Sequence, residues 1–116
     1  MPDPIPQTMT CIQITSPGGP EMLQPTRRPV PAPAVGEVLV QVAAAGVNGP
    51  DIYQRQGLYP PPPGVTDIPG LEIAGRIVAV GDGVDTWQVG DAVTALVVGG
   101  GYAEYCVAPA VQCLPV

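Results

Sequence analysis

The chain has 116 residues, of which 46% are hydrophobic, so it is long enough for one domain around a single core. Its formal net charge is −6, from ten acidic residues and four arginines, with no lysine or histidine. No basic patch exists, which argues against binding to nucleic acid or to an anionic membrane. No apolar run reaches the roughly 18 residues of a membrane-spanning helix, and no signal peptide is visible, so we expect a cytoplasmic protein.

Proline and glycine are abundant, with 17 and 15 residues. Such a content is common in disordered chains, but the apolar, nearly uncharged runs 38–47 and 71–80 indicate strands instead. We therefore expect many short strands joined by tight turns. The three cysteines, Cys11, Cys106 and Cys113, are odd in number and far apart, which favours buried free thiols over a disulfide framework.

The sequence predicts a flexible extension over residues 1–8 and one domain over residues 9–116. Residues 8–15 alternate loosely and predict a strand. A Ser-Pro-Gly-Gly-Pro turn follows, and residues 21–28 can form the partner strand. The proline-rich segment 28–33 predicts an extended connector, because each proline fixes its own φ and restricts the residue before it.

A stronger strand begins near Glu37. Val38, Val40 and Val42 share one face of it, because side chains alternate along a strand. This fully apolar face is expected to line the core.

Asn48 follows that strand and is a candidate N-cap for a short helix over residues 49–56. Pro50 is tolerated in the first turn, and Asp51 places a negative charge at the positive end of the helix. Gly57 is a plausible stop.

Asp51 and Arg55 stand four residues apart on this helix and can form an ion pair worth about 0.3 to 0.5 kcal/mol. The proline-rich residues 58–64 are expected to form an exposed loop.

The second half of the chain predicts a long strand over residues 71–81, with Glu72 and Arg76 near one another on one face. Further strands are expected over residues 92–98, 102–108 and 110–116. Gly99, Gly100 and Gly101 predict a conformationally loose loop between the first and second of these segments. About seven short strands and one brief helix favour a mainly antiparallel barrel or sandwich, without a βαβ unit.

Several kinds of chemistry are excluded by composition. Without histidine or a CxxC pair, the chain lacks the ligands of a typical metal site and the base of a Ser–His or Cys–His nucleophile. The glycine clusters lack the spacing of a phosphate-binding loop. What remains is a neutral polar group, Asn48, Tyr53 and Tyr59, with Asp51 and Arg55 beside it. These side chains can orient an amide or carbonyl ligand, or they are a helix cap and surface tyrosines.

Three runs carry a family resemblance: GEVLVQVAAAGVNGPDIYQRQGLYPPPPG, DIPGLEIAGRIVAVGDGVDTWQVGDAV and GGGYAEYCV. Together they resemble the N-terminal half of NADPH:quinone oxidoreductases of the zeta-crystallin type. These form the zinc-independent branch of the medium-chain dehydrogenase/reductase superfamily. The resemblance covers residues 9–116.

The resemblance implies a GroES-like, partly open β-barrel with one or two short helices. In the family this catalytic domain packs against a Rossmann domain, which is absent from this chain, and NADPH binds between the two. Hydride passes to a quinone or another electrophilic, often α,β-unsaturated, carbonyl acceptor. The intact protein is thus expected to be an enzyme and a homo-oligomer, whereas the chain alone, as a truncated form, should be nearly inactive.

The resemblance also implies roles for individual residues. Zinc-dependent relatives carry a catalytic cysteine where this chain has Asn48, and a histidine where it has Leu71. We therefore expect no metal. Asn48 and Tyr53 would lie beside the nicotinamide and the acceptor as catalytic residues. Asp51 would help to bind the cofactor, and Tyr53 and Tyr59 would bind the substrate.

A second hypothesis remains, in which the chain is a non-enzymatic GroES-like binding or assembly module. Such a module would need a mobile apolar loop, whereas the proline run 60–63 is stiff. A third possibility is self-association through an exposed apolar face.

Overall fold

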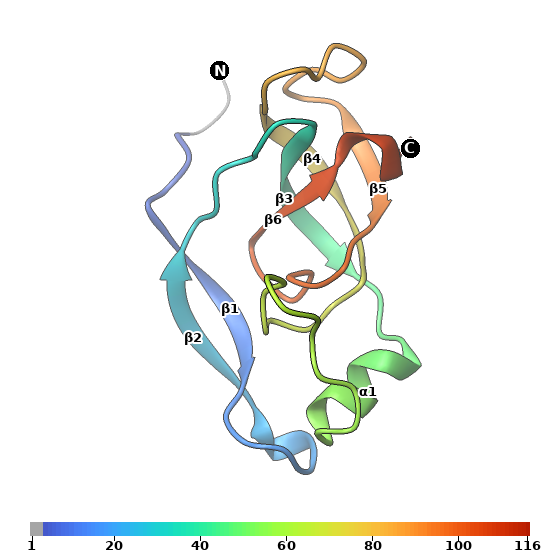
Figure 1. The fold of residues 1–116 in the computed structure, drawn as a ribbon. Coiled ribbons are helices and arrows are strands. Elements are labelled where there is room, and N and C mark those ends of the chain that lie inside the picture. The colour runs from blue at the N-terminus through green and yellow to red at the C-terminus, as the bar shows by residue number, and fades with distance from the viewer. Residues whose placement is uncertain (1–3) are drawn as a thin grey trace.

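Seven strands form two antiparallel sheets in the computed structural model, which describes residues 4–116 (Figure 1). The first sheet pairs β1 with β2, and the second has the order β6-β3-β4-β5-β7. The strands are β1 (Thr8–Ile14), β2 (Leu23–Pro29), β3 (Glu37–Ala45), β4 (Glu72–Val80), β5 (Ala92–Leu96), β6 (Tyr105–Pro109) and β7 (Cys113–Pro115). The helical pieces are α1 (Gly49–Arg55) and the 3-10 turns η1 (Pro20–Met22) and η2 (Ala110–Gln112).

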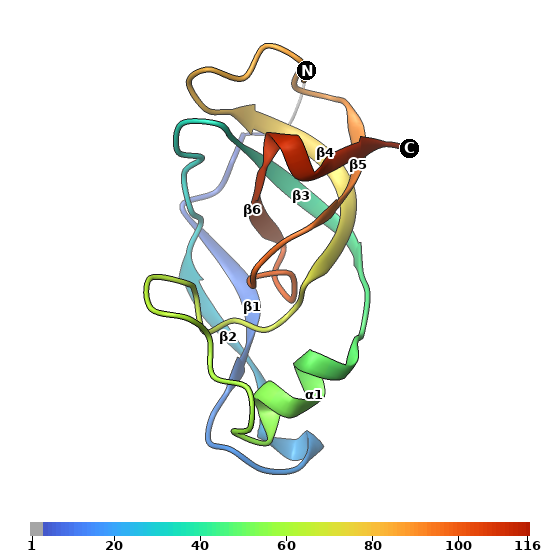
Figure 2. The same ribbon diagram turned by 45° about the vertical axis from the view of Figure 1, so that its right-hand side comes forward.

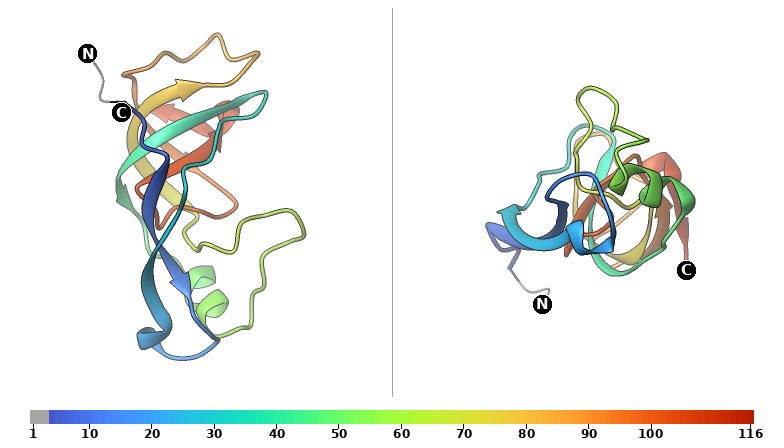
Figure 3. Two further views of the ribbon diagram at one scale, coloured as in Figure 1. Left: turned by 90° about the vertical axis from the view of Figure 1, so that its left-hand side faces the viewer. Right: turned by 90° about the horizontal axis from the view of Figure 1, so that it is seen from below.

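The five-stranded sheet curls around its own core into a partly open barrel, while α1 and the turn of the β1–β2 hairpin lie together at one end (Figures 2 and 3). The expected mainly antiparallel barrel with one brief helix is therefore confirmed. The last segment differs slightly, because residues 110–112 form η2 before β7 begins.

The core has two parts, which meet at β3. Val38 and Val40 are fully buried on one face of this strand and pack with the inner residues of β4, β5 and β6, as expected. Leu39, on the opposite face, is also buried, because it packs with Met9 and Cys11 of β1. The hairpin thus covers the outer face of β3, which the alternation of residues in β3 did not predict.

The segment 102–104 joins the two sheets. Ala103 forms an isolated antiparallel bridge with Cys11. The Ile12 N–H donates to the Tyr102 carbonyl at 2.8 Å, and the Glu104 N–H donates to the Thr10 carbonyl at 3.1 Å. The hairpin is therefore held to the barrel through backbone hydrogen bonds of this segment.

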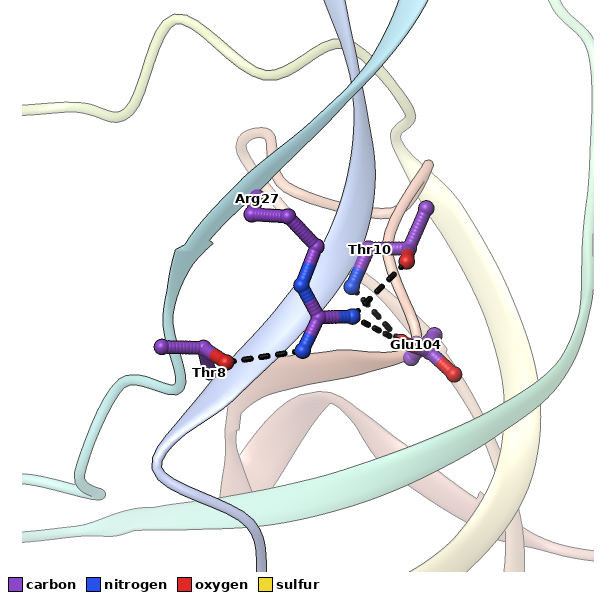
Figure 4. A network of polar contacts seen from close by, with 4 residues as sticks. All are labelled: Thr8, Thr10, Arg27 and Glu104. Atoms are coloured by element: carbon purple, nitrogen blue, oxygen red, sulfur yellow. Dashed lines mark hydrogen bonds and ion pairs between the residues drawn. The ribbon is translucent and has the colours of Figure 1, made fainter.

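Side chains add to this junction, as Figure 4 shows. The guanidinium of Arg27 donates to the hydroxyl oxygens of Thr8 (2.7 Å) and Thr10 (2.9 Å), and lies 3.8 Å from the Glu104 carboxylate. Glu104 in turn accepts the Thr10 N–H at 2.6 Å. Both members of the Arg27–Glu104 pair are exposed, so this ion pair contributes at most about 1 kcal/mol.

One local expectation is wrong. The three glycines 99–101 do not form a loose loop, since Gly100 and Gly101 are buried and their N–H groups donate to the carbonyls of Ile68 and Gly70. Glu72 and Arg76, which were expected to lie near one another without pairing directly, are both in β4, and the Arg76 guanidinium donates to the Gly90 carbonyl at 3.0 Å.

Of the expected flexible extension, residues 1–3 lie outside the described part, and Thr8 belongs to β1. The Gln7 carbonyl accepts a hydrogen bond from the Val30 N–H at 2.9 Å. The expectation of buried free cysteines is confirmed for Cys11, Cys106 and Cys113. Within residues 4–116, no helix has the length and apolar character needed to cross a membrane.

Candidate functional site

Helix α1 begins at Asn48, as expected from the sequence. Asn48 is extended and half-buried, and its N–H donates to Oδ2 of Asp51 at 3.0 Å. Asn48 and Asp51 have the arrangement of a capping box, in which the side chain of each residue faces the backbone N–H of the other. The N–H of Asp51 donates its hydrogen bond to the backbone carbonyl of Asn48, at 3.0 Å, and not to the Asn48 side chain. The N-terminal turn of α1 is thus fixed by Asn48 and Asp51 together.

Asp51 is buried, with only 5% of its surface exposed. Its Oδ2 accepts two hydrogen bonds, from the Asn48 N–H and from the hydroxyl of Tyr102 at 2.8 Å. Its Oδ1 is buried without a partner among the described residues. Asp51 therefore connects the start of α1 to the segment that joins the two sheets.

The expected ion pair between Asp51 and Arg55 is wrong. Asp51 points into the protein toward Tyr102, whereas the Arg55 Nε–H donates to the Gly18 carbonyl at 3.1 Å. The Gly18 N–H also donates to the Arg55 carbonyl at 2.9 Å. Arg55 thus fastens the C-terminal end of α1 to the hairpin turn, and the two ends of the helix are held separately.

Tyr102 is the residue of this site that sequence reasoning missed. Burial is the main cause of a pKa of its hydroxyl well above the ordinary range, and the hydrogen bond to Asp51 adds to it. The hydroxyl therefore stays protonated and remains a donor. The only sequence signal was a tyrosine placed directly after three glycines.

Backbone contacts set the position of Tyr102. Its N–H donates to the Pro69 carbonyl at 2.9 Å. Gly70 has a φ of +108°, and a Cβ there would lie 2.6 Å from the nitrogen of Tyr102. Only glycine allows the two segments to approach this closely.

The start of β4 lies beside the link between β3 and α1. The Gly46 N–H donates to the Glu72 carbonyl at 2.9 Å, and the Val97 N–H donates to the Leu71 carbonyl at 2.8 Å. Leu71 and Glu72 are therefore held near the residues that lead into Asn48. Among residues 4–116, no three side chains of His, Cys, Asp or Glu gather where they could hold a metal ion.

Tyr53 and Tyr59, the other two predicted site residues, face solvent. Their exposed fractions are 54% and 47%, and their hydroxyl groups make no hydrogen bond to a described residue. Three further large apolar side chains are exposed on the same part of the chain, and together these five residues form what we call the α1 surface: Val47, Ile52, Tyr53, Leu58 and Tyr59.

Two pockets are relevant to the predicted site residues, one beside α1 and one beside the β1–β2 hairpin. A small one of about 120 Å³ is lined by Asp51, Ile52 and Tyr102, among others. A larger apolar one of about 210 Å³ lies between the hairpin and β6, and none of the four predicted site residues lines it. Its wall includes Cys106, whose thiol has a pKa raised to about 12 by burial and is therefore unreactive.

Residues 34–116 match the family described as the alcohol dehydrogenase GroES-like domain. A quinone oxidoreductase of Lama guanicoe is 44% identical over 102 residues, which are 86% of this chain and 31% of that protein. The chain thus spans about a third of the length of that relative.

Solved structures are similar as well. The human synaptic vesicle membrane protein VAT-1 homolog-like protein superposes with a TM-score of 0.86 and 32% identity, over 94% of this chain and 35% of that one. A mycobacterial protein solved in complex with NADPH superposes with a TM-score of 0.80 and 38% identity, over 93% of this chain and 32% of that one. With the family match covering most of its length, the chain belongs to the alcohol dehydrogenase GroES-like domain family of oxidoreductases.

Proposed function

We propose that this chain supplies the acceptor side of the active site of an NADPH-dependent, zinc-independent quinone oxidoreductase. The observation that carries the proposal is that Asn48 begins α1 two residues after Gly46, whose N–H donates to the carbonyl of Glu72, the residue that follows Leu71. Asn48 and Leu71 are the positions at which zinc-dependent relatives are expected to carry their ligands. A neutral amide and a leucine there suit hydrogen bonding and apolar contact rather than metal binding.

The residues fit the nicotinamide end of the cofactor. The carboxamide NH₂ of Asn48 donates no hydrogen bond to a described residue, so it can bind the carboxamide of a nicotinamide or the carbonyl of an acceptor. The exposed rings of Tyr53 and Tyr59 offer flat surfaces to a planar acceptor.

The residues do not provide a site for the pyrophosphate. The four arginines each have a partner: Thr8 and Thr10 for Arg27, Asp67 for Arg28, Gly18 for Arg55 and Gly90 for Arg76. The chain therefore forms one wall of the proposed site, and a second, nucleotide-binding domain would form the other.

Bound NADPH would supply a hydride to the quinone or the α,β-unsaturated carbonyl. This chain's residues orient the reactants: Asn48 holds a carbonyl or carboxamide, Tyr53 and Tyr59 hold the acceptor ring, and Asp51 keeps Asn48 in place. Holding the two reactants in the productive geometry is the main contribution expected of such a protein surface.

The test compares the chain alone with the chain joined through Val116 to the nucleotide-binding domain of a quinone oxidoreductase relative. With NADPH and 1,4-benzoquinone, the chain alone should show no turnover above the uncatalysed rate, and the joined protein should be active. Asn48→Ala should lower kcat/KM about tenfold, the loss expected for one oriented hydrogen bond. Gln56→Ala, at the exposed C-terminal end of α1, is the control.

Two outcomes would contradict the proposal. A joined protein that binds NADPH but does not reduce the quinone would show that quinone reduction is not its reaction. Full activity in the Asn48→Ala variant would show that the Asn48 side chain does not orient a reactant. Reading the gene beyond the codon for Val116 gives an independent check, since a glycine-rich βαβ unit is expected there.

A further inference from the structure

We propose that Tyr102 is a positioning residue for Asn48 and acts on it through the buried carboxylate of Asp51. The effect expected on catalysis rests on the function proposed above, whereas the placement of Asn48 does not.

The three residues form a continuous series of contacts. The Tyr102 hydroxyl donates to Oδ2 of Asp51 at 2.8 Å, and the same oxygen accepts the Asn48 N–H at 3.0 Å. Because both donors meet on one atom, the position of that oxygen sets the position of the Asn48 backbone. Hydrogen bonds to a charged acceptor are stronger than neutral ones, so each contact restrains the next.

Tyr102 is itself held firmly by the barrel. Its N–H donates to the Pro69 carbonyl, and its carbonyl accepts the Ile12 N–H. Gly101, directly before it, and Glu104, two residues after it, donate their N–H groups to the carbonyls of Gly70 and Thr10. The hydroxyl is therefore presented from a fixed backbone, which a positioning residue requires.

Helix α1 needs such a restraint at its N-terminal end. It has only seven residues, and isolated helices of this length are unstable in water. Its C-terminal end is fastened to the hairpin through Arg55 and Gly18. Among the described residues, Asp51 is the only buried charged side chain, so its contact with Tyr102 fastens the other end to the barrel.

Tyr102 does not need to touch a ligand to act in this way. Burial and the contact with Asp51 hold the pKa of its hydroxyl above the ordinary range, which makes the group a persistent donor and a poor acid. Proton donation to the acceptor is thus left to another group, and the contribution of Tyr102 is geometric.

The first experiment uses this 116-residue chain and NMR. Tyr102→Phe removes only the hydroxyl, and Tyr105→Phe is the matched control, because its hydroxyl makes no hydrogen bond to a described residue. We expect Tyr102→Phe to change the residual dipolar coupling of the Asn48 N–H and to speed its hydrogen exchange at least about fivefold. Tyr105→Phe should change neither. An unchanged Asn48 in the Tyr102→Phe variant overturns the proposal.

The second experiment is a double-mutant cycle in the joined protein described above. Tyr102→Phe should lower kcat/KM about fivefold when Asn48 is present, and by less than about 1.5-fold in the Asn48→Ala background. A merely structural role for Tyr102 would give the same loss in both backgrounds, and that result overturns the proposal. If the joined protein has no quinone activity, the proposed function fails, and the NMR result alone decides whether Tyr102 positions Asn48.

Discussion

The hydroxyl of Tyr102 lies 2.8 Å from Oδ2 of Asp51, a residue 51 positions earlier in the chain. This contact links the segment that joins the two sheets to the start of α1. It makes a buried carboxylate, rather than an apolar side chain, the anchor of the helix that carries the candidate site.

Asp51→Asn should lower the free energy of unfolding by about 2 kcal/mol, because two hydrogen bonds to a buried charged acceptor are weakened and an amide NH₂ becomes buried near the unpartnered Oδ1 position. Urea unfolding measures this change. Asp85→Asn, on an exposed turn, should change stability by less than about 0.5 kcal/mol. Equal effects of the two substitutions would show that Asp51 contributes no more than a surface carboxylate.

Gly70→Ala should destabilise the fold by about 2 kcal/mol or more. A Cβ at this position would lie 2.6 Å from the Tyr102 nitrogen, and the φ of +108° is one that alanine rarely adopts. Thermal unfolding of the variant measures the loss. Gly49→Ala is the control, since nothing lies within 4 Å of its added Cβ and alanine favours a helix. A Gly70→Ala protein as stable as the control would show that the backbone can shift without cost.

The sequence predicted the local features well, because these depend on neighbouring residues. The faces of β3, the N-cap at Asn48 and the exposed loop after α1 follow from alternation, capping and proline content. The burial of Leu39 was missed because the covering hairpin comes from a distant part of the chain.

In the candidate site, too, the local features were predicted and the contacts between distant parts of the chain were not. Asp51 and Arg55 were expected to pair because they are four residues apart, but each has a better partner from another element, Tyr102 and Gly18. Such contacts depend on tertiary packing, which residue spacing along one helix does not describe. The roles of Tyr53 and Tyr59 stay predictions, because their exposed side chains have no contact that assigns them one.

Stability should fall at alkaline pH. Burial raises the pKa of the Cys106 thiol from 9.0 to about 12, and it also raises the pKa values of Cys11, Cys113 and Tyr102. In the unfolded chain a thiol loses its proton near pH 9, whereas the folded protein keeps it. The free energy of unfolding therefore decreases as the pH rises from about 9 toward 12, by at most about 1.4 kcal/mol per pH unit for each group.

Urea unfolding between pH 7 and pH 11 measures this slope. Cys106→Ser removes one titrating group and should make the decline above pH 9 shallower, while its effect on stability between pH 6 and pH 8 should be constant. A stability that is flat from pH 8 to pH 11, or a slope unchanged by Cys106→Ser, would contradict the assigned burial of this thiol.

The chain should associate through the outer side of β5, η2 and β7. Five large apolar residues are exposed there, and β7 is an edge strand of the five-stranded sheet: Leu96, Val98, Val111, Leu114 and Val116. An apolar surface beside an open strand edge favours self-association. The net charge of −6 opposes it, so added salt should strengthen the association by screening.

Sedimentation velocity across a range of protein concentrations and at low and high salt measures this association. Leu114→Glu places a charge in the middle of the apolar side and should keep the chain monomeric at concentrations where the unchanged chain associates. Leu58→Glu is the matched control, because Leu58 has a similar exposed fraction, 71% against 64% for Leu114, but it follows α1, at the other end of the molecule from the C-terminus (Figure 1). Since salt strengthens apolar contacts and screens like charges, a monomer at every concentration and salt level would show that this surface does not bind a second copy.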